Sequence, residues 1–280
     1  MGKNEVLIDG LSFSEGPRWR EGHLWFSDMH LGQVVKVDLA GKSEVVAEVP
    51  NSPSGLGWLP DGRLLVVSMN DRRVLRLDSD GLHEHADLSN LASWHCNDMV
   101  VDSKGRAYVG NFGWDIFTSQ TPVATNLVLV TPEGDTSIAA EDLVFPNGTV
   151  ITPDGRTMVI GETFAARLTA FDIGDDGGLT NRREWARLEG AAPDGICLDA
   201  EGAIWVASPV SSEVLRVLEG GEVTERISVE EQAFACMLGG PEGKHLFICT
   251  APGSEPEECR AAKAGRIEVV EVGVPGAGLP

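Results

Sequence analysis

Signals of membrane or exported proteins are missing from this sequence of 280 residues. No stretch is apolar and long enough to cross a bilayer. The first residues, MGKNEVLIDGLSFSEG, lack the apolar run of a signal peptide. We therefore expect a cytoplasmic protein with no membrane partner.

Cysteine and positive charge are also scarce. The five cysteines are odd in number and form no CxxC pair, which argues against a disulfide framework and against a zinc ribbon. The formal net charge of -21 repels phosphates and anionic lipids and attracts cations. We expect no nucleic-acid partner.

Familiar catalytic motifs and helical patterns are absent as well. The sequence has no GxSxG elbow, no HExxH, no Walker loop and no GxGxxG after a strand, so serine-hydrolase, zincin and nucleotide-binding interpretations lack support. No sustained helical stripe is visible, which favours an all-β chain.

What the sequence does contain is a repeated unit of strand, polar-Gly turn and strand. The turn glycines recur about every 40 to 50 residues, the spacing of propeller blades; they are Gly22, Gly62, Gly105, Gly155, Gly202 and Gly243. Further short strand candidates lie between these hairpins, so that two hairpins make one four-stranded unit. No linker or composition break divides the chain.

These patterns predict a single domain over residues 1–280. It is an all-β, six-bladed β-propeller with four-stranded antiparallel blades around a central channel. Residues 113–125, which include Trp114 and Phe117, interrupt the blade pattern. We expect them to form a loop or lid whose aromatic side chains shape the mouth of a pocket.

Aligning the copies by their turns places one residue at the entrance of each first strand. These residues are Glu15, Ser54, Asn97, Asn147, Asp194 and Ala235. In a propeller they would converge on one end of the channel, and the two carboxylates and two amides among them suit calcium, magnesium or manganese. Asn and Asp before glycine are also ordinary turn residues, but four oxygen donors in one register favour a metal site.

Neighbouring residues are candidates for substrate contacts. Asp98 follows Asn97 and is interpreted as a contact of a metal ligand, as a substrate contact or as a turn residue. His95 precedes Asn97 by two residues and could orient a substrate or move a proton, or simply pack. Phe112, Trp114 and Phe164 lie next to the expected mouth and are interpreted as the lining of an apolar pocket or as core.

Four separated motifs resemble the gluconolactonase/regucalcin family, also called the senescence marker protein family: SEGPRW at 14–19, ND at 97–98, PNG at 146–148 and PDGICLDAEGAIWVA at 193–207. The resemblance covers nearly the whole chain. It implies a six-bladed propeller lactonase that holds one divalent cation, usually calcium or zinc, in the channel. It also implies that Glu15, Asn147 and Asp194 are metal ligands and that Asn97 binds metal or substrate.

The sequence departs from this family in two places. Sugar-lactone members typically have an arginine near the ND pair, and here His95 stands in that place, in the sequence HCND. The aromatic residues of 112–117 also differ from a strictly sugar-binding pocket. Both departures favour a more apolar lactone or ester as the substrate.

The resulting hypothesis is a metal-dependent hydrolase that opens a lactone. Calcium is the expected ion, with zinc, manganese and magnesium as alternatives, and Asp194 is either the base that activates water or only a ligand. One rival is an organophosphate or aryl ester hydrolase resembling diisopropyl fluorophosphatase or paraoxonase. Another is a non-catalytic calcium-binding propeller. The sequence gives no indication of the oligomeric state.

Overall fold

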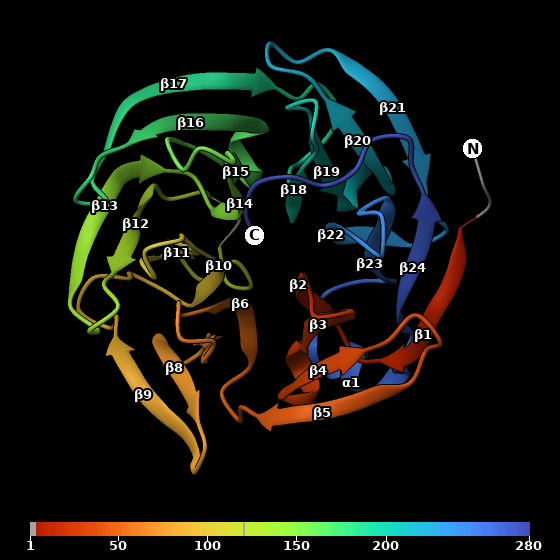
Figure 1. Ribbon diagram of the computed structural model, residues 1–280, viewed down its shortest axis with the longest axis horizontal. Coiled ribbons are helices and arrows are strands. Elements are labelled where there is room, and N and C mark those ends of the chain that lie inside the picture. The colour runs from red at the N-terminus through yellow and green to blue at the C-terminus, as the bar shows by residue number, and fades with distance from the viewer. Residues whose placement is uncertain (1–3, 120) are drawn as a thin grey trace.

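Six antiparallel sheets surround a central channel in the computed structural model, which describes residues 4–119 and 121–280 (Figure 1). Each sheet has four strands, and the 24 strands of these two ranges are distributed evenly among the six blades. The predicted all-β, six-bladed propeller is therefore confirmed.

Blades 1 to 5 each use four consecutive strands, with the first strand beside the channel (Figure 1). Blade 1 contains β2 (Ser14–Arg20), β3 (His23–Asp28), β4 (Gln33–Val37) and β5 (Ser43–Glu48). Blade 2 contains β6 (Pro53–Trp58), β7 (Leu64–Ser68), β8 (Arg73–Asp78) and β9 (Gly81–Asp87). Blade 3 contains β10 (Cys96–Val101), β11 (Ala107–Asn111), β12 (Thr125–Val130) and β13 (Thr136–Leu143). Blade 4 contains β14 (Pro146–Ile151), β15 (Thr157–Glu162), β16 (Arg167–Ile173) and β17 (Leu179–Arg187). Blade 5 contains β18 (Ile196–Leu198), β19 (Ile204–Ser208), β20 (Glu213–Val217) and β21 (Val223–Ser228).

Blade 6 closes the ring by joining the two ends of the chain. Its inner three strands are β22 (Gln232–Gly239), β23 (His245–Ala251) and β24 (Gly265–Glu271), and its outer strand is β1 (Glu5–Leu11). β1 pairs antiparallel with β24, with Glu5 opposite Val269. Ring closure turns the inner edge of each blade toward the channel and leaves its outer strand as the edge on the outside of the ring.

The inner hairpins form where the repeat predicted them. All six turn glycines, from Gly22 to Gly243, have positive φ, the conformation that only glycine adopts without strain. Apolar faces of neighbouring blades then pack on each other. For example, Trp19 of blade 1 stacks on Phe247 of blade 6 with ring centroids 5.3 Å apart.

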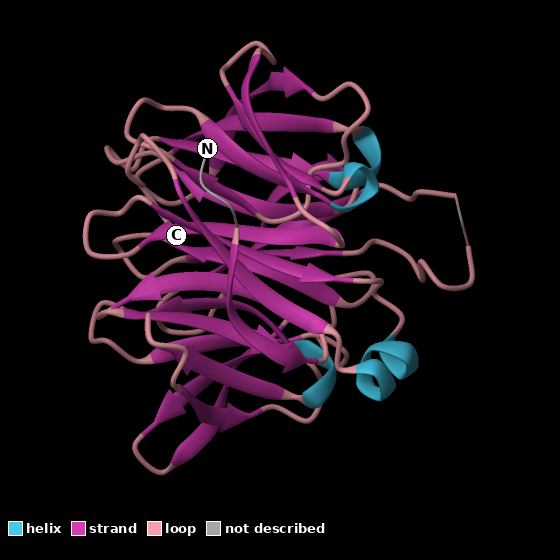
Figure 2. Ribbon diagram, turned by 90° about the vertical axis from the view of Figure 1, so that its right-hand side faces the viewer, coloured by secondary structure: helices cyan, strands magenta, loops and turns pink. Residues whose placement is uncertain are grey.

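The two faces of the propeller differ. The short helices η1 (Met29–Leu31), η2 (Thr163–Ala165), η3 (Pro209–Ser211) and α1 (Pro256–Ala262) each connect the second and third strands of a blade. Figure 2 shows them on one face, together with the long β11–β12 connection. The C-terminal residues cross the opposite face, where Gly276 bridges to Asp199 and Leu279 to Ile151. None of the helices in the described ranges is long and apolar enough to cross a membrane.

Candidate functional site

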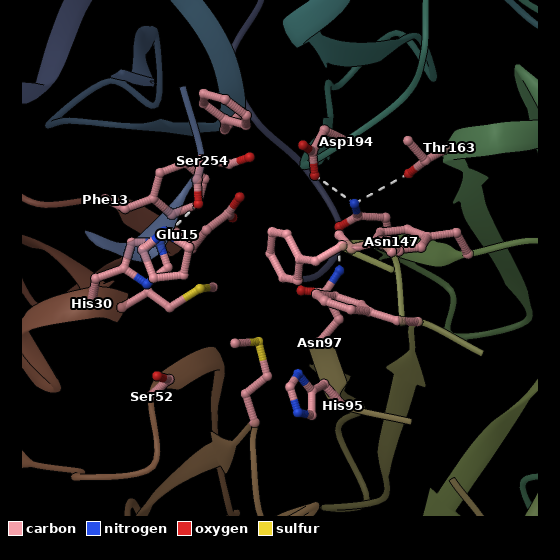
Figure 3. Close-up of a pocket in the computed structure, with 18 of the residues that line it drawn as sticks. Phe13, Glu15, His30, Ser52, His95, Asn97, Asn147, Thr163, Asp194 and Ser254 are labelled. Atoms are coloured by element: carbon pink, nitrogen blue, oxygen red, sulfur yellow. Dashed lines mark hydrogen bonds between the residues drawn. The ribbon is translucent and has the colours of Figure 1, made fainter. Parts of the chain in front are cut away.

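A cavity of about 570 Å³ opens on the face that carries the helices. Four polar side chains that line it come from the channel end of four blades, namely Glu15, Asn97, Asn147 and Asp194 (Figure 3). The first three are the second residues of β2, β10 and β14, and Asp194 lies just before β18. The structure thus brings together the four predicted metal-binding residues.

Hydrogen bonds connect three of these side chains in a row. Asn97 Nδ2 donates to Asn147 Oδ1 over 3.0 Å, and Asn147 Nδ2 donates to Asp194 Oδ1 over 2.5 Å. Asn147 Nδ2 also reaches Thr163 Oγ1 at 3.2 Å. The carboxylate of Glu15 accepts only the backbone N–H of the adjacent Gly16 among the hydrogen bonds found in the described residues, at 3.1 Å. Most of the oxygen-donor capacity of the two carboxylates is therefore still available.

Glu15, Asn97, Asn147 and Asp194 form what we call the floor of the cavity. Burial makes negative charge costly at this floor. Desolvation, followed by the nearby charges of Asp194 and Asp98, raises the pKa of Glu15 well above its usual value. Desolvation and the charge of Asp98 raise the pKa of Asp194 to about 8, although its hydrogen bond from Asn147 acts in the opposite direction. Two buried carboxylates with two amide groups are a hard-oxygen set whose charge a divalent cation would neutralise, so these residues fit such an ion.

The glycines of the PNG and PDG motifs have a structural role. Gly148 N donates to Asp194 O at 3.1 Å, and Gly195 N donates to Phe234 O at 2.8 Å, so each joins its inner strand to the next blade. A Cβ atom on Gly148 would lie 2.4 Å from Ile196 N, and one on Gly195 would lie 2.6 Å from Ala235 Cβ. Each residue that follows Asn147 or Asp194 must therefore be glycine for the inner strands to approach so closely.

Asp98 follows Asn97 in blade 3, as Gly148 follows Asn147 in blade 4 and Gly195 follows Asp194 in blade 5. Strand β10 is irregular here, since its register with β11 shifts between Cys96 and Met99. Asp98 accepts a hydrogen bond from Arg18 Nη2 at 2.7 Å, and the same nitrogen donates to Met99 O at 2.6 Å. Asp98 does not line the cavity. The charge of Asp98 still acts on Glu15 and Asp194, whose pKa values it raises. Asp98 forms a buried ion pair between blades 1 and 3, and its role as a substrate contact stays a prediction.

Three of the four other predicted contacts line the cavity. His95 does so while its ring stacks on Trp94, with centroids 5.0 Å apart, and desolvation lowers its pKa. Phe112 and Phe164 also line it, and Phe112 stacks on Phe145 at 4.6 Å. Phe112, Phe145 and Phe164 form an aromatic wall on one side of the cavity. Trp114 lies behind this wall, edge-on to Phe145 and Phe164 with ring centroids 5.8 and 5.2 Å apart. It contributes to the packing of the wall rather than to its surface.

Two aromatic residues of the wall were missed in the sequence although a signal exists for them. Phe13 and Phe145 line the cavity and precede Glu15 and Asn147 by two residues, as His95 precedes Asn97. The same spacing from a proposed ligand in three blades could have identified both, although Phe145 itself has a positive φ of 56° and is not extended.

The remaining lining residues come mostly from the connections between second and third strands. They are Met29, His30, Met69, Asn70, Ile116, Phe117, Thr163, Ser254, Pro256 and Arg260, with Ser52 and Phe234 from the segments that lead into inner strands or from their beginning. The connections differ in length and sequence from blade to blade, so the repeat carries no signal for them.

A second group of potential ligands lies far from this floor, on the β8–β9 hairpin. Ligand atoms of Asp78, Asp80 and His83 lie within 4.8 Å of one another. Asp78 is already paired with Arg63 at 3.2 Å and with Arg76 at 2.6 Å, and Asp80 and His83 are exposed.

Comparison with known proteins identifies the family. Residues 13–252 match the family model described as the SMP-30/Gluconolactonase/LRE-like region, and the chain therefore belongs to this family. The family resemblance found in the sequence is confirmed.

Individual relatives match over most of their length. The chain is 26% identical to the 6-deoxy-6-sulfogluconolactonase of Pseudomonas putida, over 95% of this chain and 93% of that protein. It is 27% identical to lactonase drp35 of Staphylococcus saprophyticus, over 91% of this chain and 76% of that protein. Among solved structures, the calcium-binding protein regucalcin from Agrobacterium tumefaciens superposes with a TM-score of 0.83 at 23% identity, over 99% and 96% of the two chains. At that identity the structural likeness supports the fold alone.

Proposed function

We propose that this protein is a metal-dependent hydrolase that opens a lactone more apolar than gluconolactone. The observation that carries the proposal is the convergence of Glu15, Asn97, Asn147 and Asp194 at the floor of one cavity. Two relatives that align over nearly the whole chain are named as lactonases, which supports the same reaction class.

Glu15, Asn147 and Asp194 would hold one divalent cation, for which calcium is the expected ion, and Asn97 would bind the ion or the substrate. When bound, the ion would supply Lewis-acid polarisation of the lactone carbonyl. Asn147 donates to Asp194 Oδ1, and in this proposal the other carboxylate oxygen of Asp194 accepts a proton from the attacking water molecule. Opening the ring then yields a hydroxy acid.

The wall of the cavity supports an apolar substrate. Phe112, Phe145 and Phe164 line one side, and Phe13 and Phe234 line another. Phe13 and Phe234 meet edge to face with centroids 4.7 Å apart. Hydroxyl groups of a sugar lactone would lose water against these rings without gaining hydrogen bonds, whereas alkyl groups gain contact area.

The reaction is tested with Asp194→Ala, using Asp154→Ala as the matched control because Asp154 is an exposed turn carboxylate. Glucono-1,5-lactone, δ-decalactone, an aryl ester and a fluorophosphate serve as substrates, and metal content is measured on every protein. We expect lactone hydrolysis that a chelator abolishes and calcium restores. Asp194→Ala should lose metal and at least about 100-fold in rate, while the control keeps both.

Equal lactonase activity in wild type and Asp194→Ala would refute the assigned role of Asp194. Hydrolysis of glucono-1,5-lactone without that of δ-decalactone would refute the apolar substrate. Preference for the aryl ester or the fluorophosphate would instead favour the rival hydrolase class. Tight calcium binding without any turnover would favour the non-catalytic alternative.

A further inference from the structure

An arginine at the rim of the cavity has no partner in the part of the chain that the structure describes. Arg260, on α1, lines the cavity together with His30 and Ser254. Within residues 4–119 and 121–280 its guanidinium makes no ion pair and no side-chain hydrogen bond. Most arginines of this acidic protein pair with a carboxylate, as Arg266 does with Glu230 at 3.7 Å.

The helix that carries Arg260 is anchored at the mouth. The neighbouring Cys259 is buried in a cluster with Phe13, Met29 and Phe234, all of which line the cavity. Its thiol donates to Gly253 O at 3.2 Å, and α1 also contacts η1. The position of Arg260 at the rim therefore follows from core packing and not from a free loop.

Charge is distributed unequally between floor and rim. The carboxylates of Glu15 and Asp194 lie at the floor. His30, which lines the cavity beside α1, has a pKa lowered mainly by desolvation, which favours its neutral form. His30 Nε2 lies 3.2 Å from Ser254 O, so a neutral His30 directs its proton there and offers no second N–H to a ligand (Figure 3).

Arg260 is thus the fixed cation in the lining among the residues described. The formal net charge of -21 creates a field that repels anions from this protein. A guanidinium at the entrance offsets that field locally and offers a planar set of donors that matches a carboxylate, sulfonate or phosphate.

We propose that Arg260 is a specificity-determining residue that binds an anionic group on the lactone substrate, at the end of the molecule away from the ring carbonyl. The proposal rests on the proposed lactonase function and specifies its substrate class. The aromatic wall holds the apolar part between the two ends. The anion at the rim and the carbonyl at the floor together select one orientation of the substrate in the cavity.

The test uses matched lactones that differ only in charge. They are δ-valerolactones with an alkyl chain at the carbon next to the ring oxygen, ending in a carboxylate or in the corresponding primary amide, in a series of chain lengths. Rates are measured for wild type, Arg260→Gln, Arg260→Lys and the control Arg266→Gln. Arg266 is a suitable control because it lies away from this cavity and also loses a positive charge when replaced.

We expect wild type to prefer the carboxylate over the amide by about five- to tenfold in kcat/KM, at the chain length that spans floor and rim. Arg260→Gln should remove this preference by raising KM for the carboxylate, with kcat and the amide kinetics unchanged. Arg260→Lys should keep part of it, and Arg266→Gln should keep all of it. Added salt should weaken the preference of wild type.

Equal rates for both members of the pair in wild type, or a loss in Arg260→Gln that affects amide and carboxylate alike, would overturn the proposal while leaving lactone hydrolysis intact. Calorimetric titration with the same pair separates the two hypotheses if no lactone is hydrolysed. Selective weakening of carboxylate binding in Arg260→Gln would then support the anion site and contradict the proposed function. Equal binding would overturn the anion site.

Discussion

Replacing Glu162 by glutamine should loosen Asn147 without altering any group that lines the cavity. Glu162 ends β15 and is fully buried. One of its oxygens accepts the backbone N–H of Val144 at 2.8 Å, three residues before Asn147. Arg167 binds the same carboxylate at 2.8 and 3.0 Å, and Arg182 binds it at 3.2 Å. The carboxylate therefore fixes the segment that leads into Asn147.

The expected loss of stability follows from these contacts. Glutamine keeps the size of the side chain and one acceptor oxygen but removes the charge that two guanidinium groups share. Breaking a fully buried pair costs about 3–5 kcal/mol. The side chains of Arg167 and Arg182 remain 27% and 33% exposed and can recover part of their hydration, so we expect a loss of about 1.5–3 kcal/mol.

Urea unfolding and calcium titration of the same samples provide the assay. The matched control is Asp172→Asn, which removes an exposed carboxylate in the same blade, 2.7 Å from Arg183, and should change stability by less than about 0.5 kcal/mol. We expect Glu162→Gln to weaken calcium binding by about three- to tenfold because Asn147 is less well fixed. Asp172→Asn should bind calcium as wild type does.

The pH dependence of stability provides a second test of Glu162. Burial raises the pKa of Glu162, but hydrogen bonds from Arg167, Thr169 and Val144 outweigh this and lower it below the usual 4.5. The stabilisation by an acid with a lowered pKa is complete above its unfolded value and is lost as the pH falls. The stability difference between wild type and Glu162→Gln should therefore shrink as the pH falls below about 4.5. A loss of stability with unchanged calcium affinity would refute the positioning role.

Three further predictions concern the wall, the inner strands and the channel. Phe164→Ala, a change at a half-exposed side chain, should lower kcat/KM for δ-decalactone by about three- to tenfold and leave glucono-1,5-lactone unaffected, as initial rates will show. Gly148→Ala should destabilise the protein by about 2–4 kcal/mol in thermal unfolding, because its Cβ would lie 2.4 Å from Ile196 N, whereas Gly273→Ala, which meets no atom within 4 Å, should have little effect. Asp98→Asn should cost about 2–3 kcal/mol in urea unfolding by depriving Arg18 of its partner, and an unchanged midpoint would contradict the importance of this ion pair.

The fold was predictable because its signals are local and repeated. Each inner hairpin has a glycine at positive φ and an apolar alternation around it, and six copies average out the errors of any one. The same register predicts that Glu15, Asn97, Asn147 and Asp194 lie at one end of the channel. Asp98 shows the limit of this reasoning, because its place beside Asn97 in the sequence gives no indication of the ion pair that it forms with Arg18 of blade 1.

The rim of the cavity was less predictable than its floor because it belongs to the connections between second and third strands. Arg260 stands on α1, the one α-helix in the part of the chain that the structure describes, within the connection between β23 and β24. Its nearness to His30 depends on the closure of the ring, which brings the last blade beside the first. No sequence spacing expresses that contact.

The residues that hold the floor in place repeat in position but not in residue type. Asp28 accepts the backbone N–H groups of Ser12 and Phe13 ahead of Glu15, at 3.1 Å each, and Ser208 Oγ accepts that of Ala192 ahead of Asp194, also at 3.1 Å. Glu162 does the same ahead of Asn147, and all three acceptors end the second strand of their blade. Their positions repeat but their residue types do not, since the site requires only a buried acceptor there. A search for repeated residue types misses them, whereas a search for buried polar residues at the ends of second strands would find them. The effect of Glu162→Gln on calcium binding at the proposed site measures whether such residues matter to the site.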